Sequence, residues 1–495
     1  MAAAKARTVD MAHPTNSSRR LLSSPRLRKA LWALFLFSAA GVRADPGGME
    51  ALPSDGVLGQ LIADSLAARP ELKQAEATVK AEEERVPQAG TLPDPTLSLG
   101  IQNDGFRSIQ VGKMETSFYQ IMVSQPLPWP GKRGMREQVA RLAAEGAGAN
   151  VSRARLSTEA EVRRAYLDLL VVRERLALLE ELERLWQRSI GTARARYESG
   201  EGAQSDVMRA QLELLRIQQR RWAMKAEEAA QIQALNRLRD HPLDEPIASG
   251  SAVRDLSLPA VSDGDAALAD AEARSPELFA ARLFEQQAQA QVRLAERERF
   301  PDLGVQAGVM LRGPLEPMWT VGISVGLPIW SGRKQSRAVA ESEARATASD
   351  QGAQAVLQVL RQRVSERRSA LSSALETVRI YRQGLLVQSQ ATTESTLAQY
   401  RVGKVTFASV LDANAGYLAD REAHLLASGE VQRIAIASAE VSMVPVGASG
   451  GGEMAGSVPG AGAAGGTSEG GLAKSSAAKG GSSAAPAGGG MSSGM

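Results

Sequence analysis

One stretch of this chain occurs twice, at residues 92–134 and 300–334, and prolines mark both of its ends. The copies open with Leu92-Pro93-Asp94 and Phe300-Pro301-Asp302, and they close with Leu127-Pro128-Trp129-Pro130-Gly131-Lys132 and Leu327-Pro328-Ile329-Trp330-Ser331-Gly332-Arg333. Inside each copy, two runs alternate between apolar and small or polar residues, as in Val305, Ala307 and Val309. A period of two is typical of β-strands. Each copy is therefore predicted to be a β-hairpin held between helices.

The predicted strands cover four segments, at about residues 96–102, 116–126, 303–311 and 318–327. Each is apolar on one face and small or polar on the other, which is typical of transmembrane β-barrels with strands of about 10 residues. A soluble β-sandwich shows the same alternation. The strands alone leave both folds open.

The first 44 residues are predicted to be a signal peptide. Basic residues precede an apolar run from Ala30 to Ala40, and Val42-Arg43-Ala44 resembles a cleavage site. This run is too short to span a membrane as a helix. The chain is therefore expected to be exported across the inner membrane, with translation starting at Met1 or Met11.

Charge and cysteine content exclude several other classes of protein. Removing residues 1–44 takes away eight of the 58 basic residues and one of the 55 acidic residues, so the net charge of the mature chain is near −4. The basic isoelectric point thus comes largely from the signal peptide and gives no reason to predict nucleic-acid binding. The chain has no cysteine, which excludes disulfides, thiolate metal sites and an acylated cysteine.

The mature sequence has no run of the ~18 or more apolar residues that a membrane-spanning helix requires. Insertion into a bilayer is then expected to use the strands, closed into a barrel, because each unpaired backbone group in lipid costs several kcal/mol. Known barrels begin at about eight strands. Four strands therefore require several chains to share one barrel, and three chains would supply twelve.

Long segments with a heptad pattern flank the strands, at residues 132–198 and 334–400. Their apolar a and d positions are Val162, Ala165, Leu169, Val172, Leu176, Leu179 and Trp186 in the first segment, and Leu357, Leu360, Val364, Leu371, Ala374, Val378, Tyr381 and Leu385 in the second. Such stripes predict long α-helices that pack against neighbours along their length. Arg367 interrupts the second stripe once. The Glu and Arg residues between the stripes are predicted to form solvated faces.

A second pair of matching motifs closes the long helices. Tyr197-Glu198-Ser199-Gly200 and Tyr400-Arg401-Val402-Gly403 align at a constant offset of 203 residues. The glycines suit the C′ position that ends a helix, and Ser205 or Asp206 is expected to cap the next helix. Each half is thus predicted to be a helical hairpin, with its turn remote from the strands and its second helix at about 205–240 or 408–443.

The whole chain is predicted to contain one structural unit twice. Pro70 and Pro276 open a helix before each strand pair, where the first helical turn tolerates proline. The two repeats and the linker between them cover residues 45–240, 266–445 and 241–265. The tail, residues 446–495, is rich in Gly, Ser and Ala and is expected to be disordered.

These duplicated motifs resemble the TolC family of outer-membrane efflux proteins. The resemblance rests on the strand pairs, the Leu-Pro elbows and the Tyr-x-x-Gly turns, which are followed by Ser205-Asp206-Val207 and Val410-Leu411-Asp412-Ala413. The Leu-Pro-Asp-Pro opening and the Pro-Trp-Pro-Gly-Lys elbow are more similar to the heavy-metal-efflux branch. The resemblance implies a mainly α fold with a transmembrane β part: a homotrimer with a twelve-stranded outer-membrane β-barrel, continued by a periplasmic α-helical coiled-coil barrel.

The same resemblance implies the exit channel of a tripartite efflux system. Such a channel sits in outer-membrane lipid, docks to a periplasmic adaptor and an inner-membrane pump of the resistance-nodulation-division type, and passively conducts substrate. Heavy-metal cations are the cargo that the branch suggests. Drug efflux and type I secretion remain alternatives with the same architecture. A coiled-coil scaffold without a pore is the alternative from another class, and the alternating strands argue against it.

In this family the tunnel closes at the helical turns. Matching by position, the resemblance implies that Asp206 bonds Tyr400 and that Asp412 contributes to an acidic ring at the constriction. Val405 stands where an arginine gate partner occurs in the family, and Ser409 where a second acidic ring occurs. These two departures leave the closed state weaker than the family pattern implies, unless Lys404, which is adjacent to Val405, substitutes for the arginine.

Simpler roles remain open for the same residues. Asp206 can serve as a plain helix cap, and Tyr400 as a packed aromatic of the coil. A single Asp412 would be solvated, but three copies around a three-fold axis would repel one another, raise each other's pKa and favour cations. Lys132 and Arg133 are predicted to be anchors at the membrane boundary.

Motifs of enzymes are absent from the sequence. Gly131-Lys132 lacks the upstream glycine spacing of a phosphate-binding loop, and His13, His241 and His424 have no metal-ligand spacing. No catalytic residue, metal site or cofactor is therefore predicted.

Overall fold

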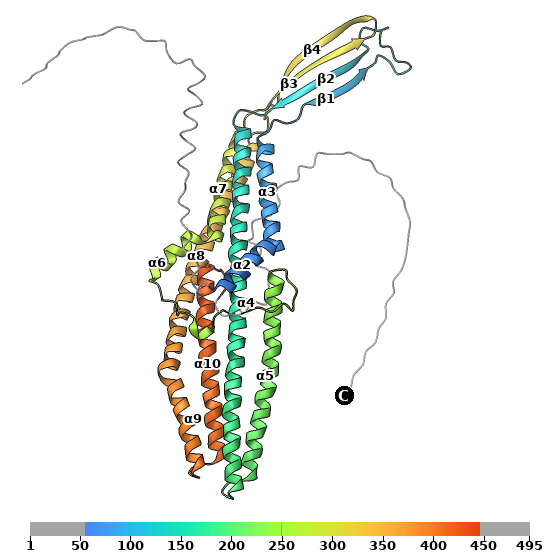
Figure 1. Cartoon of the computed structure of the whole chain (residues 1–495). Helices are drawn as coiled ribbons and strands as arrows, with labels where there is room; N and C mark the ends of the chain where they lie inside the picture. Colours follow the sequence, from blue (N-terminus) through green and yellow to red (C-terminus); the bar gives the residue numbers. More distant parts are fainter. Residues whose placement is uncertain (1–54, 249, 446–495) are drawn as a thin grey trace, which may run out of the picture. The chain divides into compact units, whose positions relative to one another are not determined.

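The structure, a computed structural model, describes residues 55–248 and 250–445 (Figure 1). The predicted signal peptide and tail lie outside the described residues. Two series of elements follow one another in the same order. The first series contains α2 (Gly56–Ala68), α3 (Pro70–Gly90), β1 (Thr96–Gln102), β2 (Phe118–Leu127), α4 (Lys132–Glu198) and α5 (Gln204–Leu238). The second contains α6 (Gly264–Arg274), α7 (Pro276–Arg297), β3 (Leu303–Arg312), β4 (Leu315–Val325), α8 (Gln335–Ile380), η2 (Tyr381–Leu385), α9 (Leu386–Arg401) and α10 (Phe407–Ala439).

The chain divides into two compact units. One unit holds the strands and comprises residues 86–143 and 281–356 of the described chain. The other holds the helical hairpins and the linker with its short 3-10 helix, η1 (Val253–Asp255), and comprises residues 55–85, 144–280 and 357–445. In the described part of the chain, no helix is both long enough and apolar enough to cross a membrane.

The four strands form one antiparallel sheet in the order β1-β2-β3-β4 (Figure 1). The register aligns apolar residues across the sheet: Ile121 lies opposite Leu99 and Val309, and Val309 lies opposite Trp319. Because side chains alternate between faces, all of these residues share one face. Leu99 is 73% exposed and Trp319 is 78% exposed. The sheet therefore presents an uncovered apolar face, and β1 and β4 are its two unpaired edges.

Lys132 occupies the elbow between β2 and α4, and its prediction as a membrane-boundary anchor is wrong. The side chain is buried, and its Nζ donates to the backbone oxygen of Phe300 and to Oδ1 of Asp302, both at 2.7 Å. The N–H of Trp129 donates to the same Oδ1 at 2.9 Å, and the Trp129 ring stacks on Phe300 with centroids 5.6 Å apart. Lys132 therefore joins the first strand pair to the start of β3. The neighbouring Arg133 donates to the backbone oxygen of Gly90.

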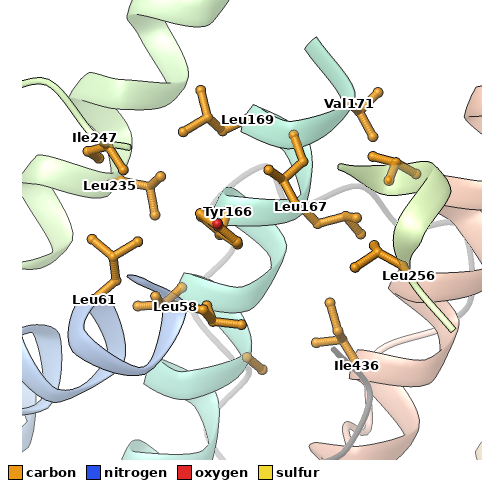
Figure 2. Packing of buried hydrophobic residues seen from close by; sticks show 14 of the residues in the cluster. Leu58, Leu61, Tyr166, Leu167, Leu169, Val171, Leu235, Ile247, Leu256 and Ile436 are labelled. Carbon is orange, nitrogen blue, oxygen red and sulfur yellow. The ribbon is translucent and has the colours of Figure 1, made fainter. Parts of the chain in front are cut away.

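The main hydrophobic core of the helical unit lies where both repeats and the linker meet (Figure 2). It contains Leu58 and Leu61 of α2, Tyr166, Leu167 and Leu169 of α4, Leu235 of α5, Ile247 and Leu256 of the linker, and Ile436 of α10. Full burial of one such leucine stabilises the fold by about 2 kcal/mol. Tyr166 also donates a hydrogen bond to Asp55, which caps α2. Residues of both helical halves therefore contribute to this core.

The heptad stripe of the second repeat changes register at η2, where the chain forms a π-helix. Leu360, Leu371 and Val378 are buried before it, and Thr393 and Tyr400 after it. Val378 and Thr393 are 15 positions apart, one more than two heptads, because a π-turn takes in one extra residue. The prediction that Leu385 continues the stripe is therefore wrong, and its side chain is 42% exposed. The single helix predicted from 334 to 400 is divided at the same point.

Arg367, which interrupts the second stripe, is buried. Its guanidinium donates hydrogen bonds to the backbone oxygens of Ser442 and Val444, beyond the end of α10. Burial lowers the pKa of Arg367 to about 10. The arginine is thus accommodated because its buried guanidinium donates to backbone carbonyl groups of the segment that follows α10.

Candidate functional site

The two helical hairpins, α4–α5 and α9–α10, end in the same backbone turn (Figure 1). Gly200 and Gly403 both have φ of +75°, a left-handed conformation that favours glycine. The N–H of Gly403 donates to the oxygen of Tyr400 and that of Lys404 to Gln399, at 3.0 and 2.9 Å. The first turn makes the equivalent bonds, from Gly200 to Tyr197 and from Glu201 to Arg196, at 3.0 and 2.9 Å. This is the Schellman pattern of helix termination, and it fixes where each helix stops.

Tyr400 connects the second turn to the first hairpin. Its ring is only 2% exposed, and its hydroxyl donates to Oδ2 of Asp206 at 3.0 Å. The ring also packs against Phe407, with centroids 5.3 Å apart. Burial and the bond to Asp206 raise the pKa of Tyr400 to about 12. The hydrogen bond between Asp206 and Tyr400 that the family resemblance implies is therefore present within one chain.

Arg196, the last residue but two of α4, completes this site. Its guanidinium carbon lies 4.9 Å from the centroid of the Tyr400 ring, in a cation–π contact. The same group donates to the backbone oxygens of Tyr400 and of Glu201, the latter at 3.0 Å. Arg196 thus donates to a carbonyl in the last turn of α9 and to one in the turn that follows α4. The group formed by Arg196, Asp206, Tyr400 and Phe407 is called the turn cluster below.

Asp206 does not cap α5, and the expectation that Ser205 or Asp206 would do so is wrong. The N-cap is Ala203, whose extended backbone starts the helix without a side-chain hydrogen bond. Asp206 lies in the first turn of α5, where a carboxylate interacts favourably with the positive end of the helix. Its side chain is therefore available to accept the bond from Tyr400.

Asp412 is exposed on α10 and has no ion pair within the described residues. No hydrogen bond or ion pair joins its side chain to the turn cluster in the described residues. Of the departures noted in the sequence, Val405 packs partly buried against the apolar cluster around Tyr400, while the hydroxyl groups of Ser409 and Thr406 are 3.3 Å apart. Lys404 is exposed and makes no ion pair in the described chain. Within one chain, the arginine that contacts Tyr400 is Arg196.

A family model decides the relationship of this chain to known proteins. The model for outer membrane efflux proteins matches residues 61–240 and 267–437, which fall in the two repeats. The chain belongs to the outer membrane efflux protein family. The resemblance to TolC-like channels seen in the sequence is thereby confirmed. This efflux protein is accordingly an outer-membrane protein with a periplasmic helical part.

Two relatives of this efflux protein carry names that describe transport or resistance. The outer membrane efflux protein BepC of Brucella suis biovar 1 (strain 1330) is 25% identical over 260 residues, which cover 50% of this chain and 55% of BepC. The chain thus spans about half the length of that relative. The nickel-cobalt-cadmium resistance protein NccC of Alcaligenes xylosoxydans xylosoxydans is 26% identical over 361 residues, which cover 72% of this chain and 77% of NccC.

Solved structures support the fold of this efflux protein. The crystal structure of CusC, described in terms of folding and transmembrane channel formation, superposes with a TM-score of 0.67 at 17% identity and covers 78% of this chain and 92% of CusC. The outer-membrane channel OprN gives a TM-score of 0.66 at 20% identity, covering 78% of this chain and 90% of OprN. The mainly α fold with a small β part is that of outer-membrane channels.

Sequence reasoning found Tyr400 and Asp206 but missed Arg196 and Phe407. The alignment of the two turns gave one clue to Arg196, because the equivalent position in the second turn is the uncharged Gln399. A residue that differs between the two aligned turns is a candidate for a role in only one of them. In the described residues, no group of three or more His, Cys, Asp or Glu side chains is arranged to hold a metal ion.

Proposed function

We propose that this efflux protein is a passive exit channel in the outer membrane, formed by three copies of the chain. The observation that carries the proposal is the four-stranded sheet with an uncovered apolar face and two unpaired edges. An apolar sheet face of this extent is stable against lipid. Edge strands with free backbone groups cannot remain open in lipid, because each unpaired group costs several kcal/mol. Three copies would close a barrel of twelve strands.

The turn cluster is proposed to hold the periplasmic end of the channel closed. Tyr400 belongs to one hairpin, whereas Asp206 and Arg196 belong to the other, so the two hairpins cannot separate without breaking their contacts. The Tyr400–Asp206 bond is partly buried, and bonds to charged groups contribute about 1.5–3 kcal/mol. Opening would require an energised partner to supply that free energy.

Asp412 is proposed to contribute to an acidic ring in the assembled channel. Its carboxylate is exposed and unpaired in the single chain. Three such carboxylates around an axis would attract cations into the pore. Heavy-metal cations are the proposed cargo, and the name of NccC as a nickel-cobalt-cadmium resistance protein supports that choice. The channel itself would hydrolyse nothing.

A periplasmic adaptor and an inner-membrane pump are the proposed partners. A groove between the ends of α4 and α9 is lined by three arginines, Arg188, Arg196 and Arg401, together with the small residues Gly191 and Ala195. A basic groove with little side-chain bulk suits an acidic or polar segment of an adaptor. The pump, of the resistance-nodulation-division type, would act through the adaptor.

The decisive experiment is planar-bilayer conductance of the purified mature protein, with an unheated gel to read its oligomeric state. Discrete, cation-preferring steps from a trimer are expected. A soluble, elongated species without conductance would contradict the channel and favour a scaffold. Silence from a membrane-bound trimer is the result expected of a closed gate, and Tyr400→Ala or Asp206→Ala should then raise conductance. Unchanged conductance in both variants would remove the gate assignment.

The lipid-facing side of the sheet has its own test. Ile323→Arg is expected to prevent stable trimers, because arginine facing the middle of the bilayer costs about 2–4 kcal/mol. Thr320→Arg on the opposite face of β4 is the matched control and should insert normally. Normal insertion of Ile323→Arg together with failure of Thr320→Arg would mean that the two faces are reversed.

A further inference from the structure

We infer that Asp94 of one copy and Arg333 of the next copy form an ion pair that fastens neighbouring chains at the base of the strands. Trp330 covers Leu92 beside this ion pair. The pair is called the clasp below. The inference rests on the proposed trimer and names the residues that join its copies. It comes from comparing two places in the strand unit. At the first, Lys132 and Asp302 form an ion pair within the chain. At the second, the equivalent residues Arg333 and Asp94 are both present but are not paired with each other.

The joint within the chain connects the first elbow to the opening of the second copy of the repeat. Lys132 donates to Oδ1 of Asp302 and to the oxygen of Phe300, the Trp129 N–H donates to the same Oδ1, and the Trp129 ring stacks on Phe300. The lysine is 3% exposed. This joint lies at the base of the β2–β3 ladder, whose last pair is Leu127 opposite Leu303.

Both halves of this joint occur a second time. Leu92-Pro93-Asp94 repeats Phe300-Pro301-Asp302, and Trp330-Ser331-Gly332-Arg333 repeats Trp129-Pro130-Gly131-Lys132. The backbone supports the second equivalence. The N–H of Lys132 donates to the oxygen of Trp129 at 3.1 Å, and the N–H of Arg333 donates to the oxygen of Trp330 at 2.9 Å. The two elbows therefore share this backbone hydrogen bond from the basic residue to the tryptophan three positions before it.

The second set of residues has no partner in the single chain. Asp94 and Arg333 are exposed and form no ion pair among the described residues, and Trp330 is 70% exposed. Asp94 precedes β1, and Arg333 follows β4. These strands are opposite edges of the sheet (Figure 1). One chain cannot bring them together, whereas a second copy placed edge to edge can, and its charges are complementary.

The strand register supports the same contact between neighbouring copies. β4 matches β2 at an offset of 200 residues, as in Ile323 and Val123, and β1 matches β3 at an offset of 208, as in Asp94 and Asp302. Applying these offsets to the observed β2–β3 pairing places Ile323 opposite Leu99 of the next copy. A slip by one residue would move every apolar side chain to the wrong face. The neighbouring apolar pairs become Val325 with Leu97 and Val321 with Ile101.

The experiment is a charge exchange in the full-length trimer, read on unheated gels as the rate of dissociation in detergent. Asp94→Arg and Arg333→Asp are each expected to speed dissociation about tenfold, since each leaves a charge of the clasp unpaired and opposed by a like charge. The double variant should restore the original rate. Single variants without effect, or a double variant no better than the singles, would overturn the clasp.

A second measurement separates failure of the clasp from failure of the trimer. Because the chain has no cysteine, Leu99→Cys combined with Ile323→Cys reports directly on the edge-to-edge register, and opposed strand residues lie within disulfide distance. A covalent trimer after mild oxidation is expected. Cross-linking without charge rescue would overturn the clasp and leave the trimer standing. Absence of both would contradict the trimer as well.

Discussion

The two hairpin turns have the same backbone conformation, but their tyrosines lie in different environments. Both turns place glycine at the same left-handed position and make the same pair of helix-ending hydrogen bonds. Tyr197 in the first turn is 47% exposed, whereas Tyr400 in the second is 2% exposed. Both repeats thus reverse the chain in the same way, but only the tyrosine of the second turn is buried against the other hairpin.

The difference arises from the residues around each tyrosine. Arg196 lies against the Tyr400 ring from the neighbouring hairpin, and Phe407 packs against the same ring. The residue equivalent to Arg196 in the second turn is Gln399, which carries no charge to place over Tyr197. The turns thus differ at three matched positions around the tyrosine: Arg196 and Gln399, Gln204 and Phe407, and Asp206 and Ser409.

Truncating the two tyrosines should give the largest contrast. Tyr400→Ala removes a buried ring and its bond to Asp206, so we expect the free energy of local opening at the turns to fall by about 3 kcal/mol. Tyr197→Ala removes an exposed ring and should change it by less than about 0.5 kcal/mol. Hydrogen exchange of the turn amides measures both values. Equal effects would show that the two turns are energetically alike.

Arg196→Ala should have the next largest effect. It removes a cation–π contact and charged hydrogen bonds to two carbonyls, which together contribute about 2 kcal/mol. Arg194→Ala is the matched control, because Arg194 makes only an exposed pair with Glu198, worth about 0.3–0.5 kcal/mol. Protease sensitivity of the turns and hydrogen exchange report the loss. An Arg194 effect as large as that of Arg196 would contradict the proposed role of the cluster.

The glycines test the part that the turns share. Gly200→Ala and Gly403→Ala should each cost about 1 kcal/mol, because both residues have positive φ. Gly403→Ala should cost more, since its Cβ would lie 3.2 Å from Nη2 of Arg196, while nothing lies near the same position of Gly200. Gly191→Ala, in the helical body of α4 with open space around it, should instead stabilise by about 0.5–1 kcal/mol. Thermal unfolding followed by circular dichroism ranks the three variants.

The smallest effect is expected from pH. The pKa of Tyr400 is raised from 10.0 to about 12, so the protonated ring is favoured in the folded chain. Its contribution to stability is then fully present below about pH 10 and is lost as the pH rises through about 12. Tyr400→Phe should remove one late step from the tyrosinate absorbance titration, while Tyr197→Phe leaves that step in place. If Tyr400→Phe keeps every late step of the titration, the raised pKa of Tyr400 is contradicted.

Features that depend on neighbours in sequence were accessible without the structure. Alternation along Val305, Ala307 and Val309 is a local property of a strand, and glycine at positions 200 and 403 satisfies a local backbone need. Contacts between distant segments were not accessible from local patterns, and the bond between Asp206 and Tyr400 was expected only from the family resemblance. Arg196 and Tyr400 are 204 positions apart, and Lys132 reaches Asp302 across 170. Nothing local distinguishes a lysine that joins two repeats from one that meets lipid headgroups.

The π-helical stretch Tyr381–Leu385 sets the direction in which Tyr400 points. Each residue of an α-helix advances the side chains by about 100° around the axis. One extra residue therefore rotates everything that follows it by that angle relative to the seam that precedes it. Without the insertion, Tyr400 would point about 100° away from its observed direction, even though every residue near it was unchanged. The contact of Tyr400 with the first hairpin thus depends on the one extra residue in this stretch, some twenty positions upstream, as well as on the tyrosine itself.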